Sequence, residues 1–199
     1  FGNSGDIAKK MDTNYLINFI FNSIHKKINK DNMSYLGDVN EAGNPLLYYN
    51  VIVDYLDSSV INILNIQSMN DKKIDGEYIQ SKINHTDKPP HIIVIELFKA
   101  YDYNKEETYT LKLNGEKIVY KLDSMVIRTT NGEHFAATIT CNNQEFVFEG
   151  ASNKRLNSFN WKSKINKNED WSFESSMYSG SEYKWNFTNG YQMLFYYRV

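Results

Sequence analysis

The amino-acid sequence predicts an α+β fold in which helices come first and an antiparallel β-sheet follows. Two segments with helical character, about residues 12–27 and 45–56, lie in the first half of the chain, and most strand-like segments follow Pro89. The 15 Tyr and 11 Phe residues also favour β structure. This order, with helices segregated from the strands, is typical of the α+β class.

The length of 199 residues fits one domain. We expect a single domain over residues 1–199, with a helical half at about residues 11–66 and a β half at about residues 90–199. The boundary between them is the polar stretch from Asn70 to Lys88, which we interpret as loop and short turns.

The helical half is predicted from caps and apolar spacing. Asp12 or Thr13 is suited to cap a helix whose apolar residues run from Tyr15 to Ile24. Pro45 is suited to begin a second helix. The short apolar run at residues 60–66 is compatible with either a helix or a strand.

The β half is predicted from apolar runs separated by turn residues. The run His91–Leu97 is almost continuously apolar, as in a strand buried inside a sheet. Asn-Gly pairs are typical of two-residue hairpin turns. The predicted strands and hairpins are 91–97, a hairpin 108–122 around Asn114-Gly115, three strands within 120–152, a hairpin within 171–188, and a last strand 191–198.

The segment 120–152 carries the residues that most indicate chemistry. His134 stands where the second strand of this segment leaves its Asn131-Gly132 turn, and Glu149 ends the third strand. A carboxylate on a neighbouring strand can hold an imidazole in one tautomer, which is what the base of a cysteine or serine hydrolase requires. His134 and Glu149 are therefore candidate catalytic residues.

Cys141, the only cysteine, lies on the same predicted strand as His134 but is not suited to be its nucleophile. It is seven residues further along, about 20 Å away by strand rise, and the odd offset directs the two side chains to opposite faces. We interpret Cys141 as a small apolar residue. A single cysteine also excludes an internal disulfide and a Cys-based zinc site, and the histidines lack metal-ligand spacing, so neither a metal nor another cofactor is expected.

Composition narrows the partners and the setting. The net charge of -2 gives no signal for nucleic-acid binding, and no stretch is long and apolar enough to span a membrane. The lack of disulfides fits an intracellular location, either cytoplasmic or in a virion or host cell. Frequent Asn, Ile, Lys and Tyr suggest an AT-rich genome, such as that of a protist or a large DNA virus.

Several motifs, in their order, resemble those of ubiquitin-specific proteases, the papain-like deubiquitinases. The resemblance covers residues from about Pro89 to the C-terminus. Its parts are the strand 88–98 after the prolines, the strand 120–127, Gly132-Glu133-His134-Phe135-Ala136 as the histidine motif, Gln144–Glu149 as the strand with the third triad member, and the closing Gly190–Arg198. The sequence departs from the family at Glu149, where Asp or Asn is usual, and at Glu133, where the family has Gly.

The N-terminal part of the resemblance concerns the nucleophile. Residues 11–23 are similar to the family's helix that opens with the catalytic cysteine, and in that alignment Met11 occupies the cysteine position. A second alignment uses Gly2-Asn3-Ser4-Gly5 and places Gly5 there. Neither residue can attack a carbonyl carbon, and the paired cysteines of the family's zinc ribbon are also absent from the sequence.

The resemblance implies a papain-like cysteine-protease fold with N-terminal helices packed on the C-terminal antiparallel sheet. It implies His134 as base and Glu149 as the residue that orients it. The leading hypothesis is a catalytically inactive pseudoenzyme that binds ubiquitin, a ubiquitin-like protein or another protein, and neither nucleic acid nor membrane. One alternative is an active deubiquitinase whose cysteine was replaced or lies outside this chain. Another is a structural or scaffold protein, such as a virion component, that retains only the fold.

Overall fold

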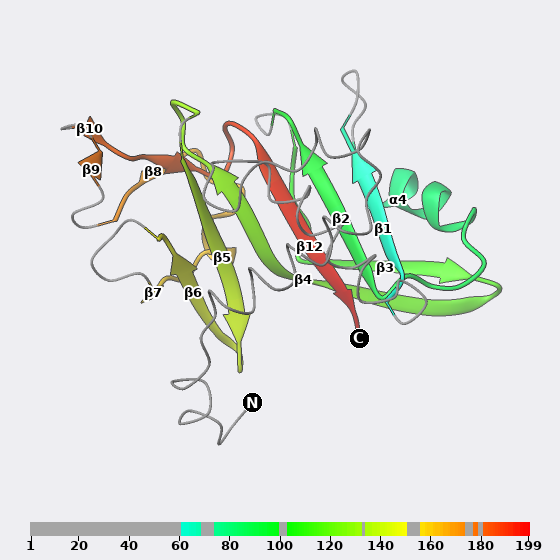
Figure 1. Ribbon diagram of the computed structural model, residues 1–199. Helices are drawn as coiled ribbons and strands as arrows, with labels where there is room; N and C mark the ends of the chain where they lie inside the picture. The colour runs from blue at the N-terminus through cyan, green and yellow to red at the C-terminus, as the bar shows by residue number, and fades with distance from the viewer. Residues whose placement is uncertain are drawn as a thin grey trace, which may run out of the picture. The chain divides into compact units, whose positions relative to one another are not determined.

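The described part of the chain is built on a large mixed β-sheet (Figure 1). The computed structural model describes residues 61–68, 74–99, 103–132, 134–150, 156–173, 177–178 and 181–199. The sheet has eight strands, in the order β1-β2-β12-β4-β5-β6-β7, with β3 paired to β4 off this path. These strands are β1 (Ile63–Gln67), β2 (Ile92–Leu97), β3 (Thr108–Leu113), β4 (Glu116–Arg128), β5 (Phe135–Cys141), β6 (Gln144–Phe148), β7 (Leu156–Ser158) and β12 (Gln192–Arg198).

Two small two-stranded sheets accompany the large one. Strand β9 (Met177–Tyr178) pairs with β10 (Ser181–Glu182), and β8 (Asp170–Trp171) pairs with β11 (Trp185–Asn186). The predicted hairpin within residues 171–188 is therefore confirmed. A short 3-10 helix, η2 (Lys162–Lys164), precedes β8.

The predicted fold class of helices packed on an antiparallel sheet is wrong for the described residues. They contain a single α-helix, α4 (Gly76–Ile83), while most of the regular structure is strand. The sheet is also mixed, because β1 and β2 run parallel, with Ile63 opposite Ile92. The predicted first helix (12–27) and second helix (45–56) lie outside the described residues, all of which belong to the compact unit Ile61–Val199.

Helix α4 explains the parallel pair that the sequence did not predict. Adjacent parallel strands need a crossover connection, and α4 lies in the connection between β1 and β2. The Asp75 side chain caps the helix by accepting a hydrogen bond from the Tyr78 amide, and Ile79 and Ile83 are fully buried one turn apart. The polar stretch 70–88, which was expected to be only loop, thus contains a helix with just two buried residues.

The hairpin predicted at residues 108–122 is confirmed, and its turn is the Asn-Gly pair that marked it in the sequence. Asn114 and Gly115 join β3 to β4 with φ of 53° and 84°. Such positive angles favour Asn and Gly, which explains why the pair marks the turn. The strand predicted at 91–97 is β2, which lies inside the sheet between β1 and β12.

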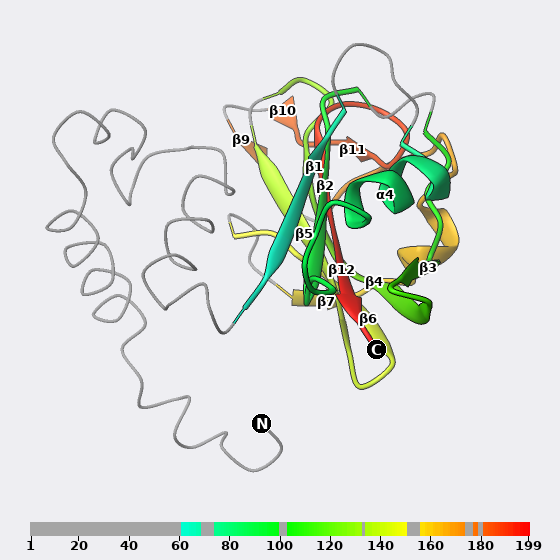
Figure 2. The ribbon, with the colours of Figure 1, turned by 90° about the vertical axis from the view of Figure 1, so that its right-hand side faces the viewer.

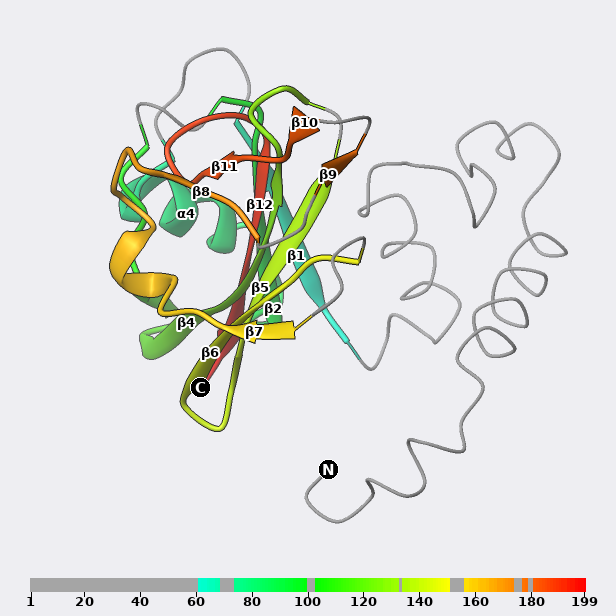
Figure 3. The same ribbon diagram turned by 90° about the vertical axis from the view of Figure 1, so that its left-hand side faces the viewer.

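The largest apolar cluster lies on one face of the sheet. A row of buried side chains crosses five neighbouring strands in register: Ile95, Leu194, Met125, Thr138 and Val147. Helix α4 and the segment with β8 and β11 lie on the same side of the sheet (Figures 2 and 3). Their buried residues, among them Ile79, Trp185 and Phe187, belong to the same apolar cluster.

Lys105 is an ionisable residue inside this core, with only 2% of its surface exposed. Its Nζ donates hydrogen bonds to the carbonyl oxygens of Phe187 at 2.5 Å and Ile165 at 3.1 Å. Burial lowers the pKa of Lys105 from 10.5 to about 7, because a charged ammonium loses hydration there. Within the described residues, no helix is long and apolar enough to cross a membrane.

Candidate functional site

The structure brings His134 and Glu149 together at one end of β5 and β6. His134 Nε2 lies 2.5 Å from Glu149 Oε1. The register pairs Ala137 with Phe148, so His134 and Glu149 lie on the same face of the sheet as diagonal neighbours. Side chains on a diagonal are further apart than directly opposite ones, so the extra methylene of Glu, compared with Asp, suits this pairing.

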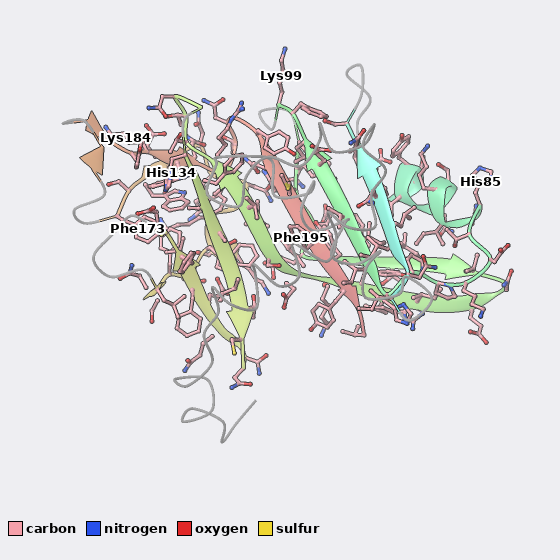
Figure 4. The ribbon with its side chains drawn as sticks, viewed as in Figure 1. His85, Lys99, His134, Phe173, Lys184 and Phe195 are labelled. Carbon is pink, nitrogen blue, oxygen red and sulfur yellow. The ribbon has the colours of Figure 1, made fainter. Side chains whose placement is uncertain are left out.

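The two partners differ in their access to solvent. The Glu149 side chain is 0% exposed, whereas the His134 side chain is 29% exposed. The imidazole therefore lies between a buried carboxylate and the surface. Figure 4 shows His134 at this end of β5, well away from Phe195 on β12.

The hydrogen bond to Glu149 determines which imidazole nitrogen is the base. A neutral imidazole that donates through Nε2 must have its lone pair on Nδ1. Within the described residues, no hydrogen bond to Nδ1 of His134 is found. This arrangement can accept a proton at Nδ1 while the carboxylate stabilises the resulting imidazolium.

The turn before His134 holds its backbone in place. The Thr129 hydroxyl accepts a hydrogen bond from the His134 amide at 3.0 Å, and the Thr129 amide donates to the His134 carbonyl at 2.7 Å. Gly132, inside the turn, has φ of +84°, which a residue with a side chain rarely adopts. The predicted Asn131-Gly132 turn therefore fixes the point at which His134 enters β5.

Aromatic side chains form one wall of the site. The Tyr183 ring is stacked on the His134 imidazole, with centroids 4.8 Å apart and an interplanar angle of 11°. The Trp185 ring lies 6.3 Å from the imidazole and 6.0 Å from the Tyr183 ring. Both residues are almost completely buried.

Tyr183 was not among the site residues predicted from the sequence. The available signal was the alternation in Tyr183-Lys184-Trp185, which places two aromatic rings on one face of an extended segment. The missing information was the contact between this segment and the histidine turn. The Thr130 amide donates to the Lys184 carbonyl at 2.9 Å, across more than fifty residues of sequence.

The remaining sequence candidates lie elsewhere. Cys141 is exposed at the other end of β5, next to the turn at Asn142 and Asn143. Met11 and Gly5, the two candidate nucleophile positions, lie outside the described residues. Across the described part of the chain, no group of three or more His, Cys, Asp and Glu residues is placed to hold a metal ion.

The separation of His134 and Glu149 bears on the scaffold alternative. That alternative predicted that the two side chains would be buried or too far apart to bond. Instead they are hydrogen-bonded, and the imidazole is partly exposed. The hydrogen bond is the opposite of the predicted separation, whereas the burial of Glu149 agrees with the prediction of that alternative.

Comparison with known proteins gives a structural neighbour and no sequence family. No protein-family model matches the chain, and no curated protein has a matching sequence. One solved structure similar to this chain is that of the SAGA DUB module, a deubiquitinase module, which contains Ubp8, Sgf11, Sus1 and Sgf73. The identity is 14% and the TM-score is 0.40, and the match covers 68% of this chain. The present chain spans 35% of the length of that chain.

Proposed function

We propose that this chain is a protein-binding domain, similar to ubiquitin-specific proteases, that keeps the base of a thiol-protease site but not the nucleophile. The observation that carries the proposal is the hydrogen bond between His134 Nε2 and the buried Glu149 carboxylate. The order of sequence motifs around these two residues also supports it. The proposed partner is ubiquitin, a ubiquitin-like protein or another protein.

The base half of the site would work through Nδ1. Because Glu149 accepts a hydrogen bond from Nε2–H, Nδ1 is the atom available to a nucleophile or to a hydrogen-bond donor of a bound partner. In a thiol protease, an imidazole in this state takes the proton of the cysteine and forms the thiolate. Here the same atom would serve as a hydrogen-bond acceptor for the partner.

The absence of a suitable thiol argues against a covalent step. Cys141 is the only cysteine in the sequence and is exposed at the opposite end of β5 from His134. A thioether at Met11, or a hydrogen at Gly5, cannot form the acyl intermediate that a cysteine protease requires. These observations support binding without cleavage as the proposed function.

A titration with ubiquitin tests the partner. The full chain should bind ubiquitin in the micromolar range, and the Cys141→Ser variant should bind equally well because Cys141 is remote from the site. The titration is followed by calorimetry and by NMR of labelled ubiquitin. Absence of binding up to high micromolar concentrations would remove ubiquitin as the partner.

A thiol-reactive ubiquitin probe tests the inactive state. The chain with this sequence should not be labelled by the probe. Labelling of the natural gene product, if that product has a cysteine at position 5 or 11 or outside this chain, would instead establish the active deubiquitinase. If the chain neither binds ubiquitin nor reacts with the probe, the scaffold alternative is the one that remains.

A further inference from the structure

The His134 imidazole is held by two independent contacts of different kinds. One is the hydrogen bond from Nε2 to Glu149, and the other is the stacked Tyr183 ring 4.8 Å away. The first fixes the position of a single atom. The second lies against the whole face of the ring, nearly parallel to it at 11°.

We propose that Tyr183 is a positioning residue that fixes the plane of the His134 imidazole and thereby directs Nδ1. A hydrogen bond to Nε2 alone leaves the ring free to rock about its Cβ–Cγ bond over the angles at which that hydrogen bond is bent but not broken. A turn about the Cβ–Cγ bond would carry Nδ1 along an arc and change what it can reach. A flat ring stacked on one face prevents the turn, because the imidazole would have to lose its contact with Tyr183.

Tyr183 is itself well placed to act as a rigid wall. Its side chain is 6% exposed, and the Trp185 ring packs against it at an interplanar angle of 63°. The next residue, Lys184, accepts a hydrogen bond from the Thr130 amide through its carbonyl. Since Thr130 lies in the turn that leads to His134, this hydrogen bond joins the segment that carries Tyr183 to that turn.

The functional meaning of this inference rests on the proposed role of His134 as the base. The positioning itself does not depend on that role, because the state of the imidazole can be measured without a partner. A failure to bind ubiquitin would therefore count against the proposed function and leave the role of Tyr183 intact.

Long-range proton–nitrogen NMR correlations of the histidine rings provide the test. In the unsubstituted chain, His134 should show one dominant tautomer protonated at Nε2, with ring protons shifted by the neighbouring aromatic ring. The Tyr183→Phe variant should keep both features because it keeps the flat ring. In the Tyr183→Leu variant the imidazole can leave the orientation in which Nε2 meets Glu149, so the minor tautomer should rise about fivefold, the equivalent of one lost aromatic pair.

Two controls separate positioning from a loss of fold. His91, whose Nδ1 accepts a hydrogen bond from the Asn62 amide, should keep its own pattern in every folded variant. Tyr197→Leu removes a half-exposed tyrosine from β12 and should leave the His134 signals unchanged. An unchanged ratio of the His134 tautomers in Tyr183→Leu would overturn the proposal, since the ring shifts change in any case when the aromatic ring is removed.

A second variant keeps the proposal testable if Tyr183→Leu does not fold. In Glu149→Gln the carboxylate is replaced by an amide of similar shape while the stacking partner is retained. If Tyr183 fixes the ring plane, the aromatic shifts of the His134 ring protons should persist in this variant. Their disappearance would show that Glu149 alone holds the ring, and the role of Tyr183 would be rejected.

Discussion

Glu149 and Lys105 are both buried, and the structure compensates the charge of each in a different way. Glu149 faces an imidazole that can carry the opposite charge and reaches the surface. Lys105 faces two neutral carbonyl oxygens and has no acidic side chain as a partner within the described residues. The partly exposed imidazole can exchange a proton with solvent or with a bound partner while Glu149 balances its charge. The buried Lys105 amine has no such access and no group to balance its charge when it is protonated.

This difference separates a group suited to chemistry from one that affects stability. A carboxylate paired with a half-accessible imidazole is the arrangement used to tune a base. An ammonium surrounded by core residues is costly in its charged form, which is why the pKa of Lys105 falls to about 7. A neutral amine still has two N–H groups, one for each carbonyl, so deprotonated Lys105 keeps both hydrogen bonds.

The largest expected effect is a rise in stability with pH that comes from Lys105. Between pH 7 and 10.5 the unfolded chain binds a proton on this lysine that the folded chain does not, so the free energy of unfolding increases with pH. The expected slope is about 1.0–1.3 kcal/mol per pH unit between pH 7.5 and 9.5. Urea unfolding across this interval measures it.

The Lys105→Met variant should remove this slope, because no proton is then taken up on unfolding. Lys112→Met, on the exposed side of β3, is the matched control and should keep the slope. Above pH 10 the tyrosines of the unfolded chain also ionise, and burial raises the pKa of Tyr120 in the folded chain to about 12, so the comparison ends at pH 9.5. Equal slopes for Lys105→Met and the unsubstituted chain would show that Lys105 is not buried in its neutral form.

The second prediction concerns an asymmetry within the His134–Glu149 pair. His134→Ala leaves a buried carboxylate without its charge-assisted partner, which should cost about 2–3 kcal/mol in the free energy of unfolding. Glu149→Gln leaves a partly exposed imidazole that water can reach, which should cost about 1 kcal/mol or less. Urea unfolding at pH 7 measures both.

His85 provides the control for this comparison. It is exposed, it follows the C-terminal end of α4, and it lies far from His134 (Figure 4). His85→Ala should change the free energy of unfolding by less than about 0.5 kcal/mol. If His134→Ala were as mild as His85→Ala, the carboxylate would be stabilised by its other contacts, and the view that the imidazole compensates its charge would be wrong.

The parts of the fold that the sequence predicted are those set by local signals. The Asn114-Gly115 turn specifies its own dihedral angles, and the strand at 92–97 is long enough and apolar enough to be recognised alone. Helix α4 was missed because only Ile79 and Ile83 carry its apolar periodicity. The parallel pairing of β1 with β2 followed from that helix and was missed with it.

The same distinction holds for the site. His134 and Glu149 were predicted because one tight turn separates their strands, so their pairing is nearly local. Tyr183 was not predicted because it reaches His134 through a contact between segments that are distant in the chain. The sequence shows an aromatic ring at Tyr183 that alternates with the polar Lys184. It does not show which other segment of the chain the ring packs against.

The smallest expected effect is that of Cys141→Ser. Cys141 is exposed beside the Asn142-Asn143 turn and contributes little to the core, so the free energy of unfolding should change by less than about 0.5 kcal/mol. Its rate of alkylation by iodoacetamide at pH 7 should be the same in the unsubstituted chain and in His134→Ala, because the imidazole lies at the other end of β5. A slower reaction in His134→Ala would mean that His134 activates this thiol. The single cysteine would then be a nucleophile after all, and the site would be an enzyme's rather than a binding surface.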